Sequence, residues 1–212
     1  MRRWPHTLIS WNRLLGGRFR DPLVARDVLA GVLFGLGVVL TMRLGIEAPA
    51  WFGGAPSLGS VSVLSTLNSP THMMYFFLLG SCLGVVYSLS LLFQLYLLHA
   101  LVRRVWLAQA LLFSFVFMVT LASTDDPLVD VPVSVIFAGL VLFALTRFGL
   151  LCSALLLFTF LVLIRAPLTL DWSAWYAGRS FAVLSFLALS LFVSAYLSLG
   201  GKPLFGKALI DD

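Results

Sequence analysis

The stretch MMYFFLLGSCLGVVYSLSLLFQLYLLHALV, residues 73–102, decides the fold. It contains no Asp, Glu, Lys or Arg along its whole length. The hydrocarbon core of a bilayer, about 30 Å thick, is crossed by about 20 apolar residues in a helix. Because the stretch is longer than this, it predicts a membrane-spanning helix and therefore an integral membrane protein.

The composition of the whole chain agrees with this prediction. Hydrophobic residues make up 60% of the 212 residues and charged residues only 11%, with a mean hydropathy of +1.02. A soluble domain carries about 25% charged residues. Cys82 and Cys152 both lie in apolar stretches, so we interpret them as inert core cysteines rather than as a disulfide. Because apolar stretches take up most of the 212 residues, no room is left for a large soluble domain.

Further apolar stretches predict five more spanning helices. The six predicted spans are residues 23–44, 73–102, 106–122, 131–146, 150–164 and a last helix that runs from an N-cap at Asp171 to residue 199. The longest predicted loop is 45–72, and the sequence TDDPLVD at 124–130 predicts an acidic turn. The expected fold is an all-α six-transmembrane-helix bundle over residues 23–199, followed by a short tail at 200–212.

Residues 1–22 form an arm before the first span. Its apolar residues recur at helical spacing among arginines: Leu8, Trp11, Leu14 and Leu15. A basic helix with one apolar face lies in the headgroup plane, so we predict an amphipathic interfacial helix. A signal peptide is rejected because Asn12, Arg13 and Arg18 interrupt the apolar stretch. A solvated basic tail is the alternative.

The arginines and lysines predict the orientation. With six spans, one side of the membrane receives all but three of the 14 positive residues, and the exceptions are Arg43, Arg165 and Arg179. Cytoplasmic loops carry the excess of Lys and Arg. We therefore expect a multi-pass membrane protein with both termini in the cytoplasm. Five spans would move the C-terminus outside and weaken this bias.

Small residues mark one face of each of the first two spans. Gly31 and Gly35 form a GxxxG pattern in the first, and Gly80 and Gly84 form one in the second. This spacing lets helix backbones approach closely in lipid. We predict that the two spans pair through these faces, although ordinary internal packing would also explain the pattern.

The chain carries no motif for catalysis. It lacks HExxH, CxxC and a phosphate-binding glycine loop, and the charges of its spans lie near their ends, which disfavours a proton-coupled transporter. His99 lies inside a span and is a weak candidate for a haem or pigment ligand. We interpret it as a hydrogen-bonded packing residue instead. We predict no cofactor, no metal site and no nucleic-acid partner.

An aromatic and basic face is expected at the outer end of the last helix. Trp172, Trp175, Tyr176 and Arg179 recur at helical spacing, which suits cation–π contact and interfacial anchoring. We predict that Arg179 pairs with the acidic turn at 124–130 or with Trp175. The face is a candidate surface for an extracytoplasmic ligand or partner, and an aromatic belt with a snorkelling arginine is the alternative.

Three segments carry a resemblance to a known family. WNRLLGGRFRDPLVARDVLAG at 11–31, PLTLDWSAWYAGRS at 167–180 and SLGGKPLFGKAL at 198–209 resemble the C-terminal membrane region of bacterial eukaryotic-like serine/threonine protein kinases. In that family a cytoplasmic kinase domain precedes the region, so the resemblance implies the same sidedness and a location in the bacterial inner (cytoplasmic) membrane. The chain has no HRD, DFG or VAIK motif, and no kinase catalytic residue is carried over.

Two classes of function follow from these observations. The first is a non-catalytic anchoring or sensory module for signalling, whose partners are the lipid bilayer and a cytoplasmic serine/threonine kinase or other membrane proteins. The alternative is a structural accessory subunit of a larger respiratory or photosynthetic membrane complex. An intramembrane enzyme ranks third, because no pair of nucleophile and base is visible.

Overall fold

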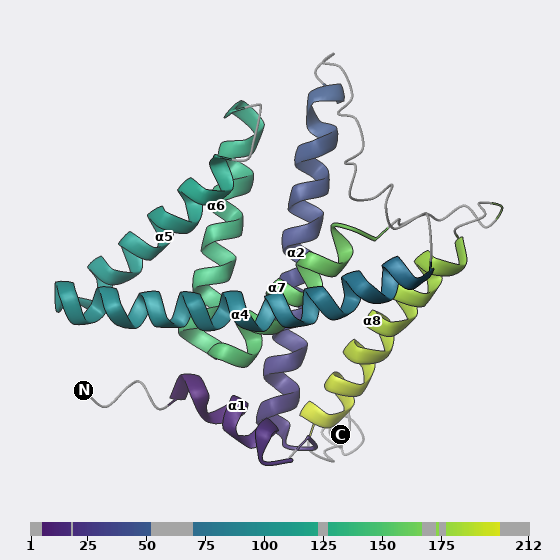
Figure 1. Ribbon diagram of the computed structural model, residues 1–212, viewed down its shortest axis with the longest axis horizontal. Coiled ribbons are helices and arrows are strands. Elements are labelled where there is room, and N and C mark those ends of the chain that lie inside the picture. The colour runs from purple at the N-terminus through teal and green to yellow at the C-terminus, as the bar shows by residue number, and fades with distance from the viewer. Residues whose placement is uncertain are drawn as a thin grey trace, which may run out of the picture.

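The fold is known from a computed structural model, which describes residues 6–17, 19–51, 70–122, 127–166, 173 and 177–199. The elements of this part are helices, without a strand among them (Figure 1). They are α1 (His6–Leu15), α2 (Pro22–Trp51), α4 (Pro70–Val102), α5 (Val105–Leu121), α6 (Pro127–Phe143), the π-helical segment η1 (Ala144–Phe148), α7 (Leu150–Leu163) and α8 (Ala177–Ser198).

Four helices are long and apolar enough to cross a membrane. Their apolar portions are Pro22–Glu47, Met74–Val102, Asp130–Phe148 and Ser180–Ser198. The apolar helices α5 and α7 are shorter; at 1.5 Å per residue, α7 is about 21 Å long. The described part of the chain is therefore all-helical, and its four long apolar helices are typical of a membrane protein. Each of the six predicted spans is a helix, four of them at full spanning length.

Several helix ends differ from the prediction, and proline explains three of them. Pro22, Pro70 and Pro127 are each the first residue of a helix. Proline suits that position because its φ is preset for a helix and its missing N–H would have no partner there. The predicted acidic turn at 124–130 is thus wrong from Pro127 onward.

The predicted loop at 45–72 is also too long at both ends. Helix α2 continues past Leu44 to Trp51, with Pro49 in its last turn, and α4 begins at Pro70. A proline in the last turn is tolerated because little helix follows it that a kink could redirect. The tail at 200–212 and the predicted N-cap at Asp171 lie outside the described residues.

Helix α7 is the centre of the fold. Eleven of its 14 residues are buried, because α2 packs along one side of it and α4 along another. Helix α8 packs on α2, while α5 packs between α4 and α6. In Figure 1, α4 runs across the direction of α2, with α7 at their crossing. The helices therefore form a crossed arrangement around α7.

The glycines of α2 face α7. A Cβ atom at Gly31 would lie 2.6 Å from the carbonyl oxygen of Cys152, and one at Gly35 would lie 2.6 Å from Thr159 Cβ. Real Cβ atoms do not approach other atoms so closely. Any side chain at these two positions would therefore push α2 and α7 apart.

The glycines of α4 also face α7. A Cβ atom at Gly84 would lie 3.0 Å from the carbonyl oxygen of Ala154, and one at Gly80 would lie 3.1 Å from Val162 Cγ2. The prediction that the two glycine faces pair with each other is therefore wrong. Both faces pack on α7, a third helix whose own small residues allow close approach from two sides.

The turn into α7 depends on glycine. Helix α6 widens into η1, and Gly149 follows with a φ of 101°, a conformation that side chains with a Cβ atom rarely adopt. The Gly149 N–H donates to the Ala144 carbonyl oxygen at 3.0 Å. This turn directs α7 away from α6 and into the space between α2 and α4.

Candidate functional site

The candidate site is the junction between α1 and α2. Helix α1 ends at two glycines, and Gly17 has a φ of 75°, which reverses the chain at little steric cost. Asp21 then caps α2, because its Oδ1 accepts a hydrogen bond from the Leu23 N–H at 3.0 Å. The cap fixes where α2 begins and so where α1 lies relative to it.

A first contact ties α1 to this cap. Arg13 Nη1 donates to Asp21 Oδ2 at 2.6 Å, and the two side chains are 37% and 15% exposed. Asp21 thus uses one carboxylate oxygen for the backbone of α2 and the other for α1. A partly exposed pair of this kind contributes about 1 kcal/mol or less.

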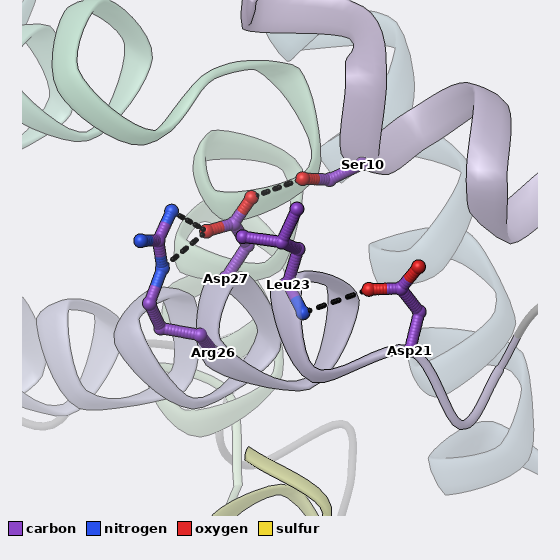
Figure 2. A network of polar contacts seen from close by, with 5 residues as sticks. All are labelled: Ser10, Asp21, Leu23, Arg26 and Asp27. Carbon is purple, nitrogen blue, oxygen red and sulfur yellow. Dashed lines mark hydrogen bonds and ion pairs between the residues drawn. The ribbon is translucent and has the colours of Figure 1, made fainter. Parts of the chain in front are cut away.

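A second contact is buried. Asp27 is 1% exposed and Ser10 is 7% exposed, and the Ser10 hydroxyl donates to Asp27 Oδ2. On the other side of the carboxylate, Arg26 donates to Oδ1 from Nε at 3.3 Å and from Nη2 at 3.2 Å. Figure 2 shows the Asp27 carboxylate between the Ser10 hydroxyl and the Arg26 guanidinium.

Arg26 extends this cluster toward the centre of the fold. Its guanidinium carbon lies 5.8 Å from the centroid of the Phe148 ring, within the range of a cation–π contact. Phe148 is the last residue of η1, directly before the turn into α7. One carboxylate therefore connects α1, α2 and the segment that leads into α7.

The energetics of Asp27 make this connection specific. A carboxylate without water is costly unless it is paired and hydrogen bonded. Ser10 and Arg26 supply those partners, and a hydrogen bond to a charged group contributes about 1.5–3 kcal/mol. Because undocking of α1 would remove the Ser10 bond, the docked position is favoured.

The chemistry of the cluster suits docking. A serine nucleophile needs an adjacent base matched to neutral pH, usually a histidine. Ser10 instead donates to the Asp27 carboxylate, which also accepts hydrogen bonds from Arg26. The oxygens of Asp21 and Asp27 already accept hydrogen bonds from the chain itself. The arrangement joins helices by paired charges.

The structure separates the other predicted site residues. His99 is half-buried in α4, and its backbone carbonyl oxygen accepts a hydrogen bond from the Arg103 N–H at 2.9 Å. Both cysteines are free; Cys152 is buried, but Cys82 is exposed on α4, so the prediction of two core cysteines is wrong for Cys82.

The outer aromatic face cannot be placed. Trp172, Trp175 and Tyr176 lie outside the described residues, as do residues 124–126 of the predicted acidic turn. Arg179 belongs to α8, but its side chain is outside the description. Its pairing with an acidic or aromatic residue stays a prediction.

The Asp27 cluster was missed by sequence reasoning, which treated the charges of the spans only as lying near their ends. One signal was available, because a lone carboxylate inside an apolar helix needs a partner. The partner could not be identified from spacing, since Ser10 is 17 residues away across a turn. Comparisons of the chain with protein-family models, with curated proteins and with solved structures gave no match.

Proposed function

We propose that the protein is a non-catalytic membrane module for anchoring or sensing, in which the arm α1 is coupled to the membrane helices. The observation that carries this proposal is the buried Asp27 carboxylate, held between Ser10 of α1 and Arg26 of α2. A change in the position of α1 would have to break or move this contact. The same contact, through Phe148, would transmit the change to the approach of α7.

The arm in this proposal is an interfacial helix with two different faces. Ser10 is 7% exposed and points to α2, whereas Leu15 is 71% exposed and Leu8 is 37% exposed. A helix that docks on water-soluble protein would bury its leucines first. The reverse arrangement suits a helix that lies in the headgroup layer with its apolar side in lipid.

The proposed topology has six spans with both termini in the cytoplasm. In Figure 1, the ends that this scheme places inside lie toward the lower left: the start of α2, the α4–α5 turn, η1 and the end of α8. The ends that it places outside lie toward the top and the right: the ends of α2 and α5 and the start of α6 at the top, and the starts of α4 and α8 at the right. This consistent separation, together with the positive charge of the inner ends, supports the proposal.

Reporter fusions test the topology. Fusions after Ala100 and Asp212 should report the cytoplasm, and a fusion after Ser123 should report the periplasm. A periplasmic signal from the Asp212 fusion would rule out six spans, since an even number of crossings returns the chain to its starting side.

The proposed partner is a cytoplasmic serine/threonine kinase. This step rests on the resemblance of residues 11–31, 167–180 and 198–209 to the membrane region of such kinases. The first of these segments contains Arg13, Asp21, Arg26 and Asp27, which build the cluster. In that family the kinase domain lies on the side of this arm, so α1 is the element best placed to pass a signal.

A spin-label experiment tests the coupling. Labels at Asn12 on α1 and Arg147 on η1, both exposed, should give one narrow distance distribution in the otherwise unchanged protein. Asp27→Leu should broaden it, because α1 loses its buried acceptor. Glu47→Gln, an exposed carboxylate at the far end of α2, is the matched control. Equal distributions in all three proteins would contradict the coupling.

Purification from native membranes tests the partner. The kinase proposal expects a serine/threonine kinase among the proteins that co-migrate on a native gel, and expects Asp27→Leu to change its activity. The alternative, an accessory subunit, expects core subunits of a larger complex in fixed stoichiometry. Mass spectrometry of the co-migrating band distinguishes the two.

A further inference from the structure

We propose that one rim of the molecule binds the headgroups of anionic phospholipids. The arginine rim consists of Arg103 and Arg104, in the turn between α4 and α5, and Arg147 in η1. All three residues are exposed. Figure 1 places this turn and η1 toward the same side of the molecule as α1. The inference concerns lipid recognition and does not depend on a kinase partner.

The charges of the arginine rim are not neutralised within the described part of the chain. The ion pairs found there are Arg13 with Asp21 and Arg26 with Asp27. The Asp21 and Asp27 carboxylates are therefore already used by arginines of α1 and α2. The described residues offer no carboxylate within ion-pair distance of the rim itself. A ligand with negative charge is the complementary partner.

The surroundings of the rim favour a lipid over a soluble anion or an acidic protein. Leu101 is 79% exposed, Val105 is 54% exposed and Trp106 is 62% exposed, directly beside the two arginines. Tryptophan is enriched at the boundary between hydrocarbon and headgroups, and arginine binds phosphate oxygens through two donors. The exposed apolar surface also continues along α4. Acyl chains would cover that surface while the phosphate meets the arginines.

The backbone at Arg103 provides a way to separate lipid binding from folding. Arg103 has a φ of 58°, the only positive φ among the described residues other than glycine. Glycine adopts this conformation without strain, whereas a residue with a Cβ atom does so at a cost. Arg103→Gly should therefore remove a charge from the rim without weakening the fold.

The experiment measures lipid preference in the full chain. The protein in nanodiscs of phosphatidylcholine is titrated with phosphatidylglycerol of the same acyl chains, and bound lipid is counted by native mass spectrometry. Each arginine near a charged surface contributes about fivefold in affinity, so the double variant Arg103→Gly with Arg104→Gln should lose about 25-fold of the preference for phosphatidylglycerol. The control is Arg43→Gln, near the C-terminal end of α2, which the proposed topology places on the other side of the membrane from the rim. This variant should retain the preference for phosphatidylglycerol.

Three results would overturn the proposal. The first is an unchanged preference in the double variant, and the second is an equal loss in Arg43→Gln. The third is full competition by glycerol phosphate, which would identify a site for a soluble phosphate instead of a lipid. Thermal unfolding in pure phosphatidylcholine is the folding control, and Arg103→Gly should unfold no earlier there than the unchanged protein.

Discussion

Helices α7 and α4 are both apolar and free of Asp, Glu, Lys and Arg, but their environments are opposite. In α7, eleven of 14 residues are buried. In α4, which has 33 residues, large side chains such as Leu78, Phe93 and Tyr96 are more than 60% exposed. An apolar sequence does not by itself decide whether a helix is buried in protein or faces lipid, because lipid is as apolar as a leucine core. The two helices differ in burial because of where their small residues lie and which neighbouring helices those residues face.

The face that α4 turns toward α7 shows what burial requires. Gly80 and Gly84 lie against α7, and Ser88, one turn further, is fully buried. On α7 itself, Cys152, Ser153 and Ala154 stand together and are buried. Because apolar contact gains little inside a bilayer, close backbone approach and dense packing must hold these helices together.

The largest expected effect comes from filling a glycine contact. Gly35→Leu would place its Cβ 2.6 Å from Thr159 Cβ and 2.9 Å from the Leu156 carbonyl oxygen. We expect the free energy of unfolding to fall by about 3 kcal/mol or more, since backbone atoms would have to move. Unfolding in mixed micelles with increasing dodecyl sulfate measures it.

The control for this variant is on the same helix. A Cβ at Gly37 would meet only Leu140 Cδ1, at 3.9 Å. Gly37→Leu should therefore leave the unfolding free energy within about 0.5 kcal/mol of the unchanged protein. Equal losses in Gly35→Leu and Gly37→Leu would show that α2 does not pack on α7 through the Gly35 face.

A smaller effect is expected from truncating one leucine in each helix. Leu156 of α7 is fully buried, whereas Leu97 of α4 is 55% exposed. Leu156→Ala should cost about 2–3 kcal/mol, because it leaves a cavity that the neighbours cannot fill. Leu97→Ala should cost less than about 0.5 kcal/mol, since lipid fills the space. The same unfolding assay measures both losses of stability. A larger loss from Leu97→Ala than from Leu156→Ala would contradict the placement of Leu156 in the core and of Leu97 on the lipid-facing surface.

The smallest effect concerns a buried hydroxyl. Thr159 is fully buried in α7, and its Oγ1 has no hydrogen-bond partner among the described residues. Thr159→Val keeps the shape and removes the polar group, so stability should be unchanged or higher by up to about 1 kcal/mol. Thr120→Val is the control, because the Thr120 hydroxyl donates to the Val116 carbonyl oxygen at 3.0 Å. Removing this hydroxyl should lower stability slightly. A loss above 1 kcal/mol in Thr159→Val would mean that the hydroxyl has a partner.

The sequence predicts the helices well and their ends poorly. Hydropathy alone identifies all six apolar segments, because each is almost free of charge, although the segments of α5 and α7 are shorter than the other four. The starts of α4 and α6 differ from the predicted ones because their first residues, which are prolines, were placed in the preceding loop or turn. Pro70 and Pro127 instead begin helices, a role that the local sequence does not distinguish from a turn.

The contacts between helices were harder to predict. The GxxxG patterns of α2 and α4 correctly indicate close approach, but spacing within one helix does not name the partner. Gly31 and Gly84 both lie against α7, whose sequence carries no GxxxG pattern. The contact of Ser10 with Asp27 was likewise inaccessible, because it depends on the reversal of the chain at Gly17.

The most direct test of the central position of α7 is labelling from the lipid phase. A bilayer-soluble diazirine is photolysed in membranes that contain the unchanged protein, and trypsin is then added. Cleavage after Arg43, Arg103, Arg147 and Arg165 yields α4 within peptide 44–103 and α7 within peptide 148–165. The structure predicts heavy carbene insertion along the exposed side of α4 and little in α7 until dodecyl sulfate unfolds the protein. Equal insertion per residue in the two peptides of the folded protein would contradict it.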